Sequence, residues 1–221
     1  MQSKQVKVKE LFDCNIEILK DFFESEEYPW QILGKLKAFI DEIIKSDISG
    51  YTEIEKGIFI GSNVKIHKSA VIESPAIIGD GTVIRPNAYL RGNVIIGTNC
   101  VIGNSSELKE CILLDKVQVP HYNYVGNSIL GNHSHMGAGS ICSNLKSDGK
   151  NVVVHADIDY ETNLRKMGAI LGDGADIGCG CVLNPGSVIG KNTSIYPLIS
   201  VRGVIPNNMI VKSMENIVKK K

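Results

Sequence analysis

The sequence predicts a mainly β protein, a parallel β-helix with a short α-helical segment before it. Three observations support this fold class. Aliphatic residues recur at every sixth position over two stretches, Ile60 to Leu114 and Leu171 to Val201. A small or branched residue follows four positions after most of these aliphatics, and Gly or Asn often precedes it. Because a period of six fits neither a helix nor an alternating strand, each repeat is expected to form one short strand and one corner.

Residues 1–50 have helical periodicity and are expected to form a separate N-terminal segment. A first apolar set lies at helical spacing, and a second follows Pro29, which suits a first helical turn: Phe12, Ile16, Leu19 and Phe23, then Leu33, Leu36, Ile40 and Ile43. Gly50 suits the exit from this segment. We expect two short amphipathic helices that pack on the first coil as a cap, because a solenoid end exposes unpaired strand edges.

Residues 51–212 are expected to form the β-helix. Three repeats close one coil, so residues about 18 apart stack on the same face. The aliphatic side chains point inward, each contributing about 1.5–3 kcal/mol on burial, and the residues between them face solvent. Gly or Asn, which tolerate a left-handed backbone, occupy the corners: Asn63, Gly81, Asn87, Asn93, Asn99, Gly174, Gly180, Gly186 and Asn192.

Two segments break the six-residue rule. Over residues 115–129 the register slips and Pro120 takes an inward position. Residues 143–168 form a polar loop insertion before the repeat resumes at Leu171. Departures from a consistent local pattern tend to mark functional sites. The last residues, 213–221, end in three lysines and are interpreted as a solvated basic tail.

Composition excludes several classes of function. The 24 basic and 24 acidic side chains balance, so no nucleic-acid footprint is expected. No apolar run approaches the ~20 residues of a membrane span, and no signal-peptide core is present. Cys100 and Cys181 fill small corner positions and Cys142 falls in the inward register, whereas Cys179 and Cys181 form a CxC pair that is more often structural than metal-binding. The chain is interpreted as cytoplasmic and reduced.

Five segments carry a family resemblance: residues 90–94, 103–109, 119–126, 136–145 and 148–150. They resemble the acetyltransferase half of the bacterial bifunctional glucosamine-1-phosphate acetyltransferase/N-acetylglucosamine-1-phosphate uridyltransferases. They resemble still more closely the β-helix half of archaeal-type sugar-1-phosphate nucleotidylyltransferases. The resemblance covers roughly residues 25–212 and is most specific over 121–150. It implies a left-handed β-helix and a homotrimer with acetyl-CoA sites between subunits.

The resemblance implies roles for the residues that would bind the sugar. His121 matches the catalytic general base, and a neutral imidazole can accept a proton near neutral pH. Arg91 and Lys109 lie 18 residues apart, so they stack on adjacent coils and can grip one phosphate. Arg85 is a rival for the arginine role. Tyr124 matches a sugar-contacting tyrosine, and Lys150 a lysine near the substrate.

Three further positions match residues that line the acetyl-CoA cleft, namely Ala138, Gly139 and Asn144. The chain departs from the bacterial pattern at Leu145, where those enzymes carry tyrosine, and at His135, where they carry asparagine. These departures concern which amino sugar is used. No metal is expected to be required.

The predicted function is acetyl transfer from acetyl-CoA to the amino group of glucosamine-1-phosphate, with galactosamine-1-phosphate or a nucleotide-linked amino sugar as alternative acceptors. No glycine-rich nucleotide loop opens the chain, so no uridyltransferase activity is expected. Two other classes remain open. A catalytically silent β-helix would serve in regulation or assembly, and a γ-type carbonic anhydrase-like enzyme would bind zinc, although His121, His133 and His135 do not match that spacing.

Overall fold

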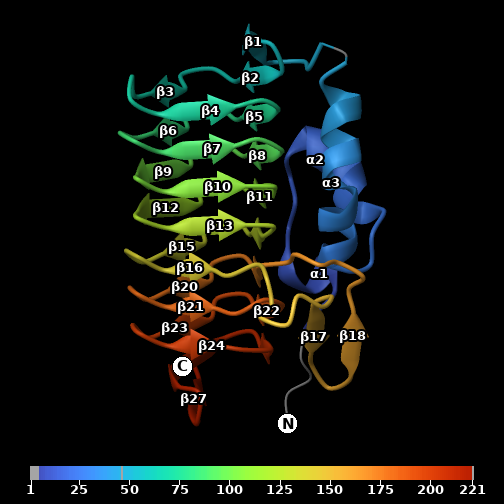
Figure 1. Ribbon diagram of the computed structural model, residues 1–221, viewed down its shortest axis with the longest axis vertical. Coiled ribbons are helices and arrows are strands. Elements are labelled where there is room, and N and C mark those ends of the chain that lie inside the picture. The colour runs from blue at the N-terminus through green and yellow to red at the C-terminus, as the bar shows by residue number, and fades with distance from the viewer. Residues whose placement is uncertain (1–4, 46, 221) are drawn as a thin grey trace.

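The computed structural model describes residues 5–45 and 47–220, and it confirms the predicted β-helix. Three sheets, here named A, B and C, form the sides of a prism, and successive coils add a parallel strand to each. In Figure 1 the chain crosses the near face from left to right, turns back through sheet A and descends. The coil is therefore left-handed.

The strands are short, and each sheet gathers its strands from along the whole chain. Sheet A consists of β1 (Thr52–Glu55), β2 (Ile58–Ile60), β5 (Ala76–Ile78), β8 (Val94–Ile96), β11 (Cys111–Leu113), β14 (Ile129–Leu130), β19 (Ala169–Leu171), β22 (Ser187–Ile189) and β25 (Val204–Ile205). Sheet B consists of β3 (Lys65–Ile66), β6 (Val83–Ile84), β9 (Val101–Asn104), β12 (Gln118–His121), β15 (His135–Met136), β20 (Asp176–Ile177), β23 (Ser194–Ile195), β26 (Met209–Ser213) and β27 (Asn216–Lys219). Sheet C consists of β4 (Val71–Glu73), β7 (Tyr89–Arg91), β10 (Glu107–Lys109), β13 (Tyr124–Gly126), β16 (Ile141–Cys142), β21 (Val182–Leu183) and β24 (Ser200–Val201).

The corners adopt the left-handed backbone that the sequence predicted. All nine of the Gly and Asn corner positions named above have positive φ, from 50° at Asn93 to 82° at Gly186. Their turns direct the aliphatic positions of successive strands into one column, where Ile84, Leu90, Ile96 and their counterparts are buried together. The column explains why the coils stack, since one coil alone could not bury its apolar side.

The register slips earlier than predicted. Ile96 pairs with Leu113, and Ile102 with Val119, so these coils contain 17 residues instead of 18. Leu113 therefore faces the core, whereas Leu114 joins the outer apolar layer. The prediction that Pro120 points inward is also wrong, because Val119 takes the inward position.

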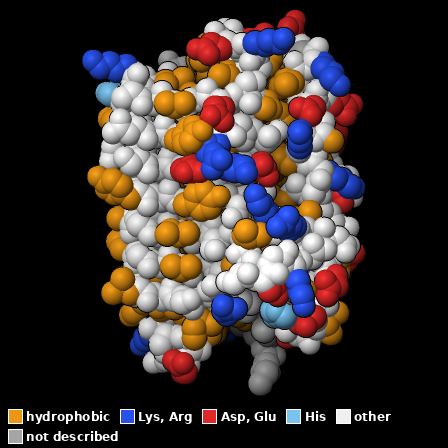
Figure 2. All heavy atoms as spheres, viewed as in Figure 1, with side chains coloured by type: hydrophobic (Ala, Val, Ile, Leu, Met, Phe, Trp, Pro, Cys, Tyr) orange, Lys and Arg blue, Asp and Glu red, His pale blue; other side chains and the backbone are white. Residues whose placement is uncertain are grey.

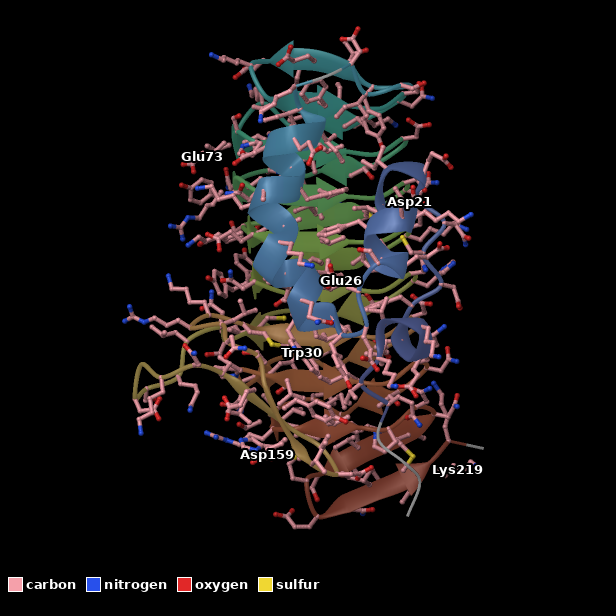
Figure 3. All side chains as sticks on the ribbon, turned by 90° about the vertical axis from the view of Figure 1, so that its right-hand side faces the viewer. Asp21, Glu26, Trp30, Glu73, Asp159 and Lys219 are labelled. Carbon is pink, nitrogen blue, oxygen red and sulfur yellow. The ribbon has the colours of Figure 1, made fainter. Side chains whose placement is uncertain are left out.

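The N-terminal helices do not cap the first coil. Helices α1 (Val8–Leu11), α2 (Glu17–Glu24) and α3 (Pro29–Ile43) instead lie along sheet A, beside many coils (Figures 1 and 3). They cover outward-facing apolar residues that were expected to face solvent: Phe59, Ile77, Ile95, Ile112, Ile129, Ile170, Val188 and Val204. Burial of this second apolar layer is what fixes the helices to the side of the prism.

Antiparallel hairpins occupy the two ends of the stack. Strand β1 pairs with β2 in the first coil, and β27 pairs with β26 in the last. The predicted solvated tail is therefore largely a strand, and Lys220 Nζ donates to the Ser194 hydroxyl at 3.2 Å. These hairpins cover the exposed coil ends that the helices were expected to cap.

The insertion of residues 143–168 contains a hairpin that packs against the helical layer. Strands β17 (Val153–His155) and β18 (Asp159–Glu161) pair antiparallel. The ring of Tyr160 lies 5.3 Å from that of Tyr28 and 5.6 Å from that of Trp30, at the start of α3. The second half of the insertion therefore braces the helices of its own chain. None of the described helices is long and apolar enough to span a membrane.

Candidate active site

His121 lies at the corner between sheets B and C, where β12 ends. Its side chain is exposed, and its carbonyl oxygen accepts a hydrogen bond from the Gly139 N–H at 3.0 Å. Gly139 has a φ of 70°, which only glycine adopts readily, and Ala138 beside it is exposed. The structure thus brings the predicted base and two predicted acetyl-CoA residues together on adjacent coils.

Asn123 is a residue of this corner that sequence reasoning missed. Its side chain is 3% exposed, and its Oδ1 accepts from the His121 N–H at 3.0 Å. Its Nδ2 donates to the Gly137 and Ser140 carbonyls at 2.8 and 3.2 Å. Asn123 therefore ties the His121 turn to the turn that contains Ala138 and Gly139. The sequence feature that could have revealed Asn123 is its place in the repeat, because an amide there occupies the position that small residues fill in most other coils.

The predicted anion site lies on the outer face of sheet C and contains carboxylates as well as cations. Arg91 Nη1 is 2.7 Å from Glu107 Oε1, and the guanidinium lies 5.8 Å from the centre of the Tyr89 ring. The hydrogen bond from Arg91 to Glu107 raises the pKa of the Arg91 guanidinium. Lys109 Nζ is 3.3 Å from Glu110 Oε1. Figure 2 shows basic side chains flanked by acidic ones midway along this face.

A hydrogen-bonded chain links this anion site to Tyr124. Glu110 Oε2 accepts from Asn127 Nδ2 at 2.6 Å, and Asn127 Oδ1 accepts from Asn144 Nδ2 at 2.7 Å. Asn144 Nδ2 also donates to the Tyr124 hydroxyl at 3.2 Å. Burial raises the pKa of Tyr124, and the nearby Glu107 charge raises it further. Glu110 and Asn127 were not predicted as site residues.

Arg85 and Lys150 are not drawn into these contacts. Arg85 is exposed just after β6, at the B–C corner, whereas Arg91 ends β7 at the far side of sheet C. Lys150 is exposed in the loop before β17, where its N–H donates to Asp148 Oδ1 at 3.0 Å. Of the two arginines, Arg91 is therefore the one whose side chain lies within the charged cluster on sheet C.

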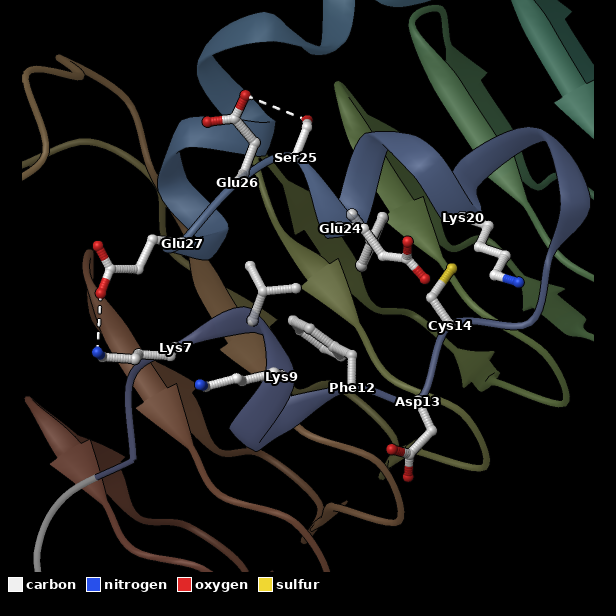
Figure 4. A pocket seen from close by; sticks show the side chains of 12 residues that line it. Lys7, Lys9, Phe12, Asp13, Cys14, Lys20, Glu24, Ser25, Glu26 and Glu27 are labelled. Atoms are coloured by element: carbon white, nitrogen blue, oxygen red, sulfur yellow. Dashed lines mark hydrogen bonds and ion pairs between the residues drawn. The ribbon is translucent and has the colours of Figure 1, made fainter.

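A groove lies next to the predicted site residues, whereas a larger cavity lies away from them. A groove of about 350 Å³ adjoins Asn144 and is lined by residues that include Ser143, Leu145, Lys146 and Arg202. A larger cavity of about 610 Å³ lies between α1 and α2, with Phe12 and Cys14 in its wall (Figure 4). The larger cavity contains none of the predicted site residues, so its size does not indicate the reaction site.

The histidines of the zinc alternative do not gather. His135 Nδ1 lies 2.8 Å from Asp176 Oδ1 on sheet B, and His133 occupies a corner with a φ of 57°. Within the part of the chain that the structure describes, no three His, Cys, Asp or Glu side chains form a metal-ligand group.

Comparison with known sequences confirms the resemblance. Residues 72–164 match the family described as the GMPPB C-terminal domain. The bifunctional protein GlmU of Methanococcus maripaludis strain C7 is 43% identical over 206 residues, which cover 90% of this chain and 49% of that protein. The bifunctional sugar-1-phosphate nucleotidylyltransferase/acetyltransferase of Sulfurisphaera tokodaii is 33% identical, covering 76% of this chain and 43% of that protein. The chain spans about half the length of such relatives.

Among solved structures, the acetyltransferase domain of PglB from Neisseria gonorrhoeae, solved with acetyl coenzyme A, is 18% identical to this chain. The match covers 71% of this chain and 57% of that domain, with a TM-score of 0.40.

Proposed function

This chain is similar along most of its length to about half the length of the archaeal GlmU relatives. On this basis we propose that it transfers an acetyl group from acetyl-CoA to the amino group of an amino-sugar 1-phosphate. Glucosamine-1-phosphate is the favoured acceptor, with galactosamine-1-phosphate as the alternative. The observation that carries the proposal is the hydrogen bond between Gly139 N–H and the His121 carbonyl, which sets the proposed base beside the proposed acetyl-CoA turn.

His121 acts as the general base. The amine nitrogen attacks the thioester carbonyl carbon, the carbon–sulfur bond breaks, and the amine proton passes to the imidazole. The imidazolium then returns that proton to the departing CoA thiolate, so that N-acetyl sugar and CoA are the products. The exposed His121 ring is open to a substrate from outside the corner.

Arg91 and Lys109 hold the sugar phosphate. Both are already paired with carboxylates, so a bound dianion exchanges one set of charge partners for another. Glu107 and Glu110 then limit how much negative charge the empty site attracts. Arg91 can contact two phosphate oxygens through its planar fork, whereas Lys109 supplies one compact charge.

The acetyl-CoA arm lies along the corner formed by Ala138 and Gly139. An exposed alanine and a glycine with φ of 70° let a chain approach the backbone closely. The groove beside Ser143 and Arg202 lies after β16 and β24, at the corner between sheets C and A on the other side of sheet C.

The experiment is an acceptor panel read by mass. Purified protein is incubated with acetyl-CoA and each of glucosamine-1-phosphate, galactosamine-1-phosphate and glucosamine lacking phosphate. The proposal predicts an acetylated product with one or both phosphorylated sugars and far less with the phosphate-free control. Equal reaction of the phosphate-free sugar would contradict the anion site. No product with any acceptor, from a folded protein, would favour the silent β-helix instead.

A further inference from the structure

The chain of hydrogen bonds from Glu110 to Tyr124 has a direction. A carboxylate has no hydrogen to donate, so Glu110 can only accept. At 2.6 Å, Asn127 must therefore turn its NH₂ group toward Glu110. That orientation places Asn127 Oδ1 toward Asn144, and the 2.7 Å contact then requires the Asn144 NH₂ group. One negative charge thus orients two amides in series.

The direction determines what Asn144 and Tyr124 present to a ligand. Both N–H bonds of the Asn144 amide are engaged, one by Asn127 Oδ1 and the other by the Tyr124 hydroxyl oxygen. The Tyr124 oxygen accepts in this contact, and burial raises the pKa of this phenol, so it keeps its proton. The groups left over are the Asn144 carbonyl oxygen, an acceptor, and the Tyr124 O–H, a donor.

Glu110 stands at a backbone position where a glutamate is unusual. Its φ is 48°, in the left-handed region that costs a non-glycine residue conformational energy. Its N–H donates to the carbonyl of Gly92, which occupies the same corner one coil earlier. Glycine thus stands at that corner in the previous coil, and glutamate stands there in this one. Lys109 holds the second carboxylate oxygen at 3.3 Å, and Asn127 is only 9% exposed. The carboxylate is therefore held in place, and little water reaches the amide it orients.

We propose that Glu110 is a positioning residue, which acts through Asn127 to make Asn144 a hydrogen-bond acceptor for the amino group of the acceptor sugar. This inference rests on the proposed function and deepens it. The Asn144 carbonyl accepts one N–H of the sugar amine, while the nitrogen lone pair stays free for the thioester. The Tyr124 hydroxyl donates to an oxygen of the same sugar. Because both N–H bonds of the Asn144 amide are engaged, the oxyanion that forms on the thioester carbonyl is left to backbone N–H groups.

Substitutions that reverse and restore the direction test the proposal. In Glu110→Gln the new amide can offer either end to Asn127, so the direction is no longer fixed. In Asn127→Asp two carboxylates face each other at the site of the 2.6 Å contact. The double variant Glu110→Gln/Asn127→Asp restores the direction, since the introduced glutamine amide donates to the introduced carboxylate and Asn144 still donates to that carboxylate from the other side. Glu55→Gln, on an exposed residue of β1, is the matched control.

Kinetics supply the first readout. Glu110→Gln is expected to raise the KM for the amino sugar about tenfold, a change of ~1.4 kcal/mol, and to leave the KM for acetyl-CoA and the melting temperature unchanged. The double variant is expected to recover to within about threefold of the parent protein, although it still lacks the carboxylate that pairs with Lys109. Unchanged sugar kinetics in Glu110→Gln, or no recovery in the double variant, would overturn the proposal.

Thermal unfolding supplies a readout that does not depend on activity. Asn127→Asp is expected to lower the melting temperature by about 4 °C, and addition of Glu110→Gln is expected to restore it. If the parent protein acetylates no sugar, the proposed function fails. The melting temperatures of the two single variants and the double variant then test the direction of the hydrogen bonds by themselves. Recovery would support the direction of the hydrogen bonds, and additive losses would overturn it.

Discussion

At the scale of residues, the anion site on sheet C is a balanced set of charges. Arg91 faces Glu107 and Lys109 faces Glu110, at 2.7 and 3.3 Å. Pairs that are partly exposed in this way contribute little to folding stability, since solvent screens them. Their arrangement on adjacent coils is compatible with the proposed phosphate site.

Lys109→Met is expected to raise the KM for the sugar phosphate about tenfold, because one of two cations facing the phosphate is lost. The KM for acetyl-CoA should not change. Lys116→Met, an exposed lysine at another corner, is the matched control and should leave both constants unchanged. Steady-state kinetics with each substrate varied separately provide the measurement. A similar rise in both variants would show a general charge effect instead of a phosphate site.

The sequence indicated which cations to consider but not their partners. The spacing of 18 between Arg91 and Lys109 follows directly from the repeat. Glu110 contacts Asn127 only because nearby coils lose one residue, which brings these two corners into line. Asn123 was likewise hidden, since a small corner position predicts packing and does not reveal that an amide there joins two turns.

At the scale of elements, the helices are bound to sheet A by a second apolar layer. Ile77 and Ile95 stand immediately before the inward residues Ile78 and Ile96, so the pattern on this side is a doubled aliphatic. That doubling was visible in the sequence and marks a strand with both faces buried. The six-residue rule alone predicted the inward layer correctly up to the register slip and again from Leu171 to Val201, but it could not reveal what covers the outside.

Ile95→Ala is expected to lower the free energy of unfolding by about 2–5 kcal/mol, because the side chain is 1% exposed between sheet A and the helices. Val71→Ala, at a residue 54% exposed on sheet C, is the control and should change it by less than ~0.5 kcal/mol. Chemical denaturation measures both values. Equal small losses would contradict the packing of the helices on sheet A.

Buried thiols predict a loss of stability at high pH. Burial raises the pKa of Cys100 and of Cys142 from 9.0 to about 12. Above pH 9 the unfolded chain releases these protons while the folded chain retains them, so the free energy of unfolding falls as the pH rises toward 12. Each thiol contributes a slope of up to ~1.4 kcal/mol per pH unit. Denaturation at pH 8, 9 and 10 should show a shallower slope in Cys142→Ala. Parallel slopes would contradict the assignment.

At the scale of the whole molecule, the prism leaves apolar side chains at its B–C corner. Leu198 and Tyr122 are 84% and 65% exposed, and both occupy turn positions with positive φ. A second copy of the chain would bury them. We therefore retain the proposal of a homotrimer, in which the corner that contains His121 faces a neighbouring subunit.

Leu198→Asp is expected to shift the protein from a species of three times the 24.1 kDa chain mass to the monomer, because it places a charge in the interface. Acetyl transfer should fall in parallel. Ile158→Asp, 63% exposed between β17 and β18, is the control and should remain trimeric. Sedimentation velocity provides the measurement. A parent protein that sediments as a monomer would contradict the trimer directly.

Acetyl transfer by the parent protein and by His121→Ala, with product detected by mass, is the decisive test of His121 as the general base. His121 is exposed, so its loss should leave the melting temperature unchanged. We expect an acetylated amino-sugar phosphate from the parent protein and a rate about 10²–10⁴-fold lower from the variant. An equal rate from a folded His121→Ala protein would contradict the site described at the B–C corner.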